Sequence, residues 1–128
     1  MAITHPTTVR NSLADLVVDL LDAGAGPGKV RVFAGGTGGT LLCQITLADP
    51  AFGAAASAVA TAAGLPKEGT ATVAGTANAF TVVDSVDVIA FQGTITATAG
   101  GGDMELTSTT IAINDVIRIN TFTYTAPP

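Results

Sequence analysis

One amphipathic helix is predicted near the N-terminus. Apolar residues recur there at the three- and four-residue spacing of a single helical face, and they are Val9, Leu13, Leu16, Val17, Leu20 and Leu21. The spacing predicts a helix over residues 8–23, capped at its start by Thr7 or Thr8 and followed by Gly24. We expect Asp15 and Asp19 to face solvent on the opposite side. The residues that we expect to be buried are Leu13, Leu16, Val17, Leu20 and Leu21.

Short strands separated by turns are predicted after the helix. Residues 29–33 alternate polar and apolar side chains, and a glycine-rich loop at 35–39 separates them from a second strand at 41–47. Asp49 and Pro50 end that strand, because the residue before proline avoids helical backbone and proline has no N–H donor. Further strands are expected at 70–74, 78–83, 88–98, 104–107, 111–113 and 116–124.

Two segments carry less regular patterns. Residues 54–63 are rich in alanine but form no amphipathic stripe, and we interpret them as extended. In the last strand the apolar residues change phase: Ile117 and Ile119 share one parity, whereas Phe122 and Tyr124 share the other. This change predicts a bulge, or burial on both faces of the strand.

These elements together indicate one mainly β domain. About eight short strands with regular turn signals favour a β-sandwich or jelly-roll-like fold, preceded by one N-terminal amphipathic α-helix. The expected organisation is an N-terminal arm at 1–7, the helix at 8–23, the β-sandwich at 29–125 and a short tail at 126–128.

Charge and composition narrow the classes of function. Only 12% of the 128 residues are charged, about half the usual share, and the net charge is −5. The five basic residues are scattered, so we expect no binding to nucleic acid. No apolar run approaches the ~18 residues of a membrane helix, and the first residues lack the pattern of a signal peptide. We therefore expect no membrane partner.

The residues that carry chemistry are few and dispersed. His5 is the single histidine and lies in the arm, while Cys43 stands inside an apolar strand where a thiol usually behaves as a small core residue. Asp103 and Glu105 have the alternate spacing of calcium ligands, but aspartate is also a common turn residue. We expect no catalytic, metal or cofactor site and predict that the chain is not an enzyme.

Two glycine-rich segments have some features of ligand-binding loops. Residues 24–29 are similar to a phosphate-binding loop, but they follow a helix and precede a strand, which reverses the required context. A helix stop followed by a turn is favoured there. The 35–39 loop lacks the order of a dinucleotide-binding motif, so we interpret it as an inter-strand loop that can become ordered on a partner.

Several segments resemble small structural proteins of tailed bacteriophages. The resemblance lies in residues 9–15, in residues 41–52 with the run Ile45 to Phe52, in residues 80–93 around Val83, Asp84 and Ser85, and in residues 116–127. It covers most of the chain and is one of style and segment order. It implies a virion protein, assembled in the host bacterial cytoplasm, that has no active-site residues.

The resulting expectation is a head decoration or cementing protein. It would bind the outside of the capsid and stabilise neighbouring major capsid subunits as a homo-oligomer, with a trimer favoured. The alternative is a tail, collar or fibre-associated module, either structural or binding a host glycan; the absence of tryptophan and the single Tyr124 favour decoration. The residues that we expect to contact partners are Ile3, His5, Gly36, Thr37 and Gly38.

Overall fold

The computed structural model describes residues 3–119 and 122–126. Helix α1 spans Thr7–Asp19, and a single 3-10 turn, η1, continues it over Leu20–Asp22. The expected capping by Thr7 or Thr8 is wrong. The helix begins one residue earlier than predicted, so Pro6 is the N-cap residue and no side chain caps the first turn.

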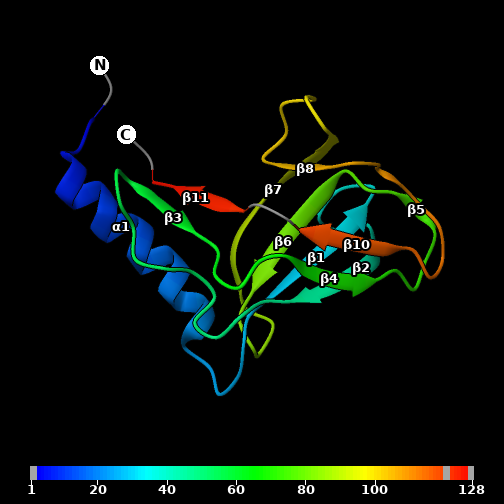
Figure 1. Ribbon diagram of the computed structural model, residues 1–128, viewed down its shortest axis with the longest axis horizontal. Coiled ribbons are helices and arrows are strands. Elements are labelled where there is room, and N and C mark those ends of the chain that lie inside the picture. Colours follow the sequence, from blue (N-terminus) through cyan, green and yellow to red (C-terminus); the bar gives the residue numbers. More distant parts are fainter. Residues whose placement is uncertain (1–2, 120–121, 127–128) are drawn as a thin grey trace.

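The largest element after the helix is a curled five-stranded sheet (Figure 1). Its strand order is β2 (Thr40–Thr46), β1 (Lys29–Ala34), β6 (Ala79–Val83), β7 (Ile89–Ala97) and β8 (Met104–Leu106). Neighbouring strands are antiparallel except for β7 and β8, which are parallel. All five residues of β6 are buried, so this strand lies at the centre of the core.

Three two-stranded ladders complete the domain. They pair β4 (Lys67–Thr70) with β10 (Val116–Ile119), β3 (Val59–Thr61) with β11 (Thr123–Thr125), and β5 (Gly75–Thr76) with β9 (Thr110–Ile111). Strand β4 lies directly beside β2. A Cβ atom at Gly69 would come within 2.6 Å of the Gln44 carbonyl oxygen, so only glycine allows this approach.

Five aromatic rings join the sheet to the β3–β11 side of the molecule. The Phe122 ring lies 5.5 Å from Phe52 and 5.7 Å from Phe80, and Phe91 lies 5.0 Å from Tyr124, all between ring centroids. Such tilted and edge-on pairs stabilise a core beyond the area that they bury.

A mainly β domain with one N-terminal helix is therefore confirmed, and most strands lie within a residue or two of their predicted bounds. Two expectations differ. The strand expected at 70–74 is β4 at Lys67–Thr70, since Ala71 already exchanges backbone hydrogen bonds with Asn114 and Asp115 in a turn. The strand expected at 116–124 is two strands in different ladders, and the predicted bulge between them falls on residues 120–121, outside the described residues.

Candidate interaction surfaces

Helix α1 faces the domain with a side that the apolar pattern did not predict. Its buried residues are Ala14, Val18 and Leu21, whereas Leu16 is 63% and Leu20 is 48% exposed. Leu13 and Val17 are half-buried. Of the five residues expected in the core, only Leu21 is fully buried, and the expectation for Leu16 and Leu20 is wrong.

Three polar side chains explain this orientation. The side-chain oxygens of Asn11, Asp15 and Asp22 accept hydrogen bonds from the backbone N–H groups of Ala58, Ala55 and Ala51, at 2.7, 2.7 and 2.9 Å. The helix therefore supplies acceptors to an irregular segment, residues 51–58, whose amides would otherwise lack partners. Asp15, which was expected to face solvent, is half-buried for this reason, and Asp19 is exposed as expected.

The opposite side of the helix presents a largely exposed apolar line. Val9, Leu13, Leu16 and Leu20 follow one another at spacings of four, three and four residues, which keeps them on one face. Val9, Leu16 and Leu20 are exposed, whereas Leu13 is half-buried and packs against the core at the edge of this line. We call these four residues the helix stripe.

A second apolar group lies at the tip of the β6–β7 hairpin. Val86, Val88 and Ile89 are 70%, 60% and 53% exposed, and we call them the hairpin tip. The strands expected at 78–83 and 88–98 predict a turn here, but these three residues were not among the predicted contacts. The signal was present, since three branched apolar residues flank a turn where polar residues are usual.

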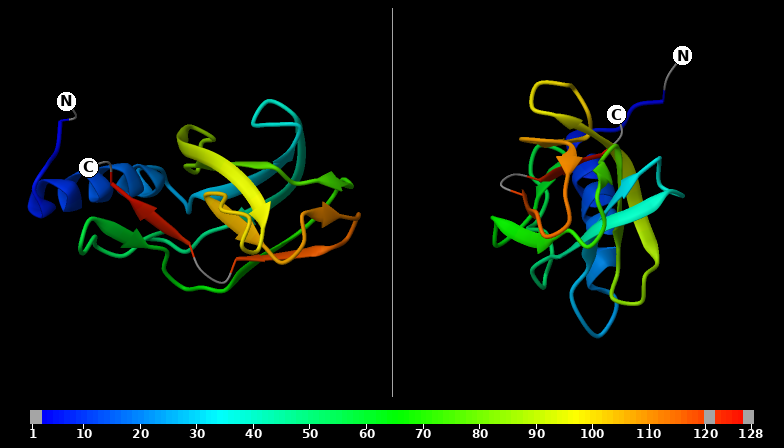
Figure 2. Two further views of the ribbon diagram at one scale, coloured as in Figure 1. Left: turned by 90° about the horizontal axis from the view of Figure 1, so that it is seen from above. Right: turned by 90° about the vertical axis from the view of Figure 1, so that its right-hand side faces the viewer.

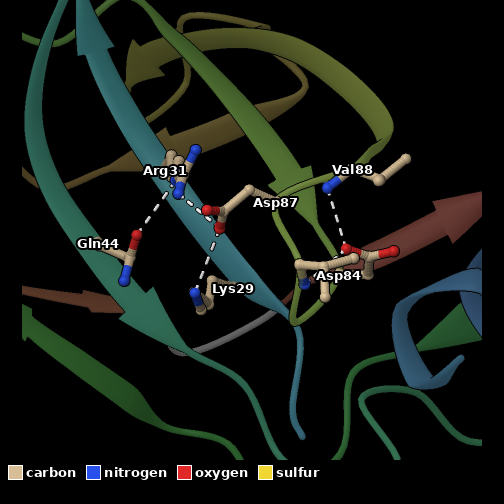
Figure 3. A network of polar contacts seen from close by, with 7 residues as sticks. Lys29, Arg31, Gln44, Asp84, Asp87 and Val88 are labelled. Carbon is tan, nitrogen blue, oxygen red and sulfur yellow. Dashed lines mark hydrogen bonds and ion pairs between the residues drawn. The ribbon is translucent and has the colours of Figure 1, made fainter. Parts of the chain in front are cut away.

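Charged residues hold the hairpin tip in a fixed shape (Figure 3). One carboxylate oxygen of Asp84 accepts hydrogen bonds from the backbone N–H groups of Val86 and Val88, both at 2.9 Å. Asp87 has a positive φ of 70° and pairs with Lys29 at 3.3 Å and Arg31 at 2.7 Å on β1. These two cations, Lys29 foremost, hold the pKa of Asp87 below its ordinary value of 3.8.

The helix stripe and the hairpin tip meet where helix α1 ends. The Ser85 hydroxyl occupies the space beside Gly24, where an added Cβ would lie only 1.8 Å from the Ser85 oxygen. Helix α1 also packs against β7, and Figures 1 and 2 both place the hairpin turn beside the C-terminal end of the helix. We call the arm, the helix stripe and the hairpin tip together the proximal end.

The remaining exposed large apolar residues gather at the opposite, distal end. They are Leu41, Val73, Ile113 and Val116. Their segments are adjacent, because Thr72 N–H donates to Leu42 O, Asn114 N–H donates to Ala71 O, and β10 pairs with β4. The 35–39 loop leads directly into β2 at this end (Figure 2).

The structure separates the predicted partner residues into two groups. Ile3 and His5 are exposed in the arm at the proximal end, and Ile3 is 82% exposed. Gly36, Thr37 and Gly38 lie in the distal loop, where Thr37 and Gly38 are exposed and Gly36 is half-buried. This loop is anchored, because Gly36 N–H donates to the Asn78 side-chain oxygen at 2.9 Å and Gly39 N–H donates to Gly36 O at 3.0 Å.

The thiol and the carboxylates singled out in the sequence are buried or make hydrogen bonds within the fold. Cys43 is buried, and burial raises the pKa of its thiol. Asp103 accepts hydrogen bonds from the backbone and hydroxyl of Thr94, and Glu105 accepts one from Gly101 N–H. Within the described ranges, no three His, Cys, Asp or Glu residues form a group that could hold a metal ion.

One cavity of about 530 Å³ lies between β8 and β10. Its charged lining residues already have partners. Glu105 accepts from Gly101 N–H, Asp115 accepts from Ala112 N–H at 2.8 Å, and Arg118 pairs with Glu68. These contacts stabilise the walls of the cavity. The candidate functional surfaces are the two groups of exposed apolar residues.

No helix among the residues described is long and apolar enough to cross a membrane. Comparisons of the chain with protein-family models, curated proteins and solved structures found no match.

Proposed function

We propose that this chain is a structural protein of a bacteriophage virion, a head decoration or cementing protein that binds the outside of the capsid. The observation that carries the proposal is the distribution of exposed large apolar side chains, because all those found among the described residues belong to two separate groups, one on the helix side with the hairpin tip and one at the distal end (Figure 1). A protein that bridges two neighbours needs two such surfaces. The resemblance of the four segments named above supports the assignment to a virion.

The low charge supports the same role. A small folded domain is kept soluble by its charged surface, yet only 12% of this chain is charged. Exposed apolar groups of this kind mark interaction sites. Both features fit a protein whose ends are covered in an assembled particle, where many copies make a modest interface sufficient through avidity.

The distal end is the surface that we assign to the major capsid protein. The run Gly35 to Gly39 lets another backbone approach closely, since Gly36 and Gly38 have open space where a side chain would stand. Ile113 and Val116, each 60% exposed, supply apolar contact beside it. In a homo-oligomer, the distal ends of two copies would contact two neighbouring capsid subunits, as a cementing protein must.

The test is binding to capsids that lack the native protein. Wild-type protein should sediment with these capsids, and Ile113→Asp should bind at least about tenfold more weakly, because a charge would enter an apolar contact. Gln92→Glu is the control. It changes the charge by the same amount at an exposed position of β7, so this variant should bind as wild type does. Equal binding by Ile113→Asp and wild type would remove the distal end from the interface.

The location on the particle is tested separately. A stained gel of purified heads and tails should show the protein in the head fraction at a copy number comparable with the capsid lattice. Recovery in tail fractions alone, at a few copies per particle, would overturn the decoration role.

A further inference from the structure

The proximal end has the pattern of a surface that pairs with itself. The helix stripe keeps the alternating four- and three-residue spacing of a two-helix seam over the twelve residues from Val9 to Leu20, a length of about 17 Å. Ser12 and Val17, which border its middle, are uncharged, whereas Arg10 and Asp19 border its two ends. We infer that α1 packs antiparallel against α1 of a second copy, around a two-fold axis that passes between Leu13 and Leu16.

Charge favours the antiparallel orientation. Asp19 is exposed on the flank of the helix stripe. Parallel helices, in a dimer or a trimer, would bring the Asp19 carboxylates of all copies to the same level. In the antiparallel pair they lie about 13 Å apart along the axis, beyond the Debye length of about 8 Å. Each Asp19 then lies near the uncharged Ser12 of the second copy.

The same orientation covers the hairpin tip. It places Val9 opposite Leu20 of the second copy, so the start of each helix lies beside the hairpin tip of the other copy, which the Ser85–Gly24 contact fixes beside the end of the helix. One two-fold interface therefore accounts for six exposed apolar residues, Val9, Leu16, Leu20, Val86, Val88 and Ile89.

The apolar area approaches that of a standard interface and fits a dimer of modest affinity. A fully exposed valine, leucine or isoleucine side chain presents on the order of 60–120 Å². At the observed exposures of 41–70%, these six side chains offer about 200–400 Å² of apolar surface per copy. The apolar part of a standard interface is about 450–500 Å² per partner. The pairing favours a dimer in place of the trimer favoured by the sequence analysis.

The first test measures the mass of the isolated protein by sedimentation or light scattering. The inference does not depend on a virion role, because it concerns the chain alone. As the concentration of wild-type protein rises through about 5–200 µM, its mass should change from that of a monomer to that of a dimer, as a modest interface predicts. Leu16→Asp should weaken the dimer at least about tenfold. Ile113→Asp adds the same charge at a distal residue of similar exposure and should remain dimeric. Circular dichroism should show that both variants are folded.

The second test fixes the orientation. Val9→Cys and Leu20→Cys are prepared as separate proteins; Cys43, which is buried, stays in both. An antiparallel pair forms the intermolecular disulfide when the two variants are mixed and oxidised, and forms little when either is oxidised alone. A monomeric or trimeric wild type, an unaffected Leu16→Asp dimer, or a disulfide formed equally well by Leu20→Cys alone would each overturn the inference. A monomer whose Leu16→Asp variant loses capsid binding would assign the helix stripe to the capsid protein instead.

Discussion

The side-chain oxygen of Asn11 accepts a 2.7 Å hydrogen bond from the backbone N–H of Ala58. Ala58 is fully buried and follows Ser57 in a tight turn, where both residues have positive φ. The turn is closed by two backbone hydrogen bonds between Ala56 and Val59. A helical side chain thus stabilises a strained turn that lies 47 residues away in the sequence.

Replacement of Asn11 by alanine should therefore destabilise the domain. The Ala58 N–H would lose its acceptor, and an unsatisfied buried donor costs about 1–3 kcal/mol. Ser12→Ala is the matched control, because the Ser12 hydroxyl donates to Thr8 O within the same helix, on its exposed side. Urea unfolding followed by circular dichroism measures both. Equal midpoints for the two variants would show that the Asn11 contact adds no stability.

Two adjacent leucines at the end of the helix should respond very differently to truncation. Leu21 is fully buried, so Leu21→Ala should cost about 2–5 kcal/mol. Leu20 is 48% exposed, so Leu20→Ala should cost less than about 1 kcal/mol when measured at a concentration where the protein is monomeric. A large cost at Leu20 in the monomer would contradict the orientation of α1.

Ser85 gives a prediction of the opposite sign. Its hydroxyl oxygen is buried beside Gly24 and has no hydrogen-bond partner among the described residues. Ser85→Ala removes that oxygen without changing the backbone, and should raise the free energy of unfolding by up to about 1 kcal/mol. Thermal melts of the variant and wild type provide the comparison. A lower melting temperature for the variant would show that this hydroxyl has a partner.

The pattern of apolar residues predicted the elements better than it predicted their partners. Periodicity located α1, β1, β2, β6 and β7, because each contains enough alternation or helical spacing to define its own conformation. It could not orient α1, since Leu16 and Leu20 mark an apolar face without showing what that face covers. The deciding contacts join Asn11, Asp15 and Asp22 to backbone donors 29–47 residues away.

The candidate surfaces were predicted in part for the same reason. The arm and the distal loop were identified because glycine runs and chain ends are visible locally. The proximal end as a whole was not, because its helix stripe and its hairpin tip come from residues 9–20 and 86–89, and only the fold brings them together. The division of the last predicted strand into β10 and β11 likewise depends on their different partners, β4 and β3.

The ion pairs of Asp87 predict how stability changes in acid. Lys29 and Arg31 lower the pKa of Asp87 in the folded protein, so the carboxylate stabilises the fold at pH values above its ordinary pKa of about 3.8. This contribution is lost as the pH falls from about 4 through the lower pKa of the folded state. Asp87→Asn keeps a residue that tolerates the positive φ but removes the charge. The variant should therefore be less stable than wild type at pH 6, and the difference should shrink below about pH 3 and in high salt. Urea midpoints across this range measure the effect, and a difference that is constant with pH would show that the Asp87 charge does not stabilise the hairpin.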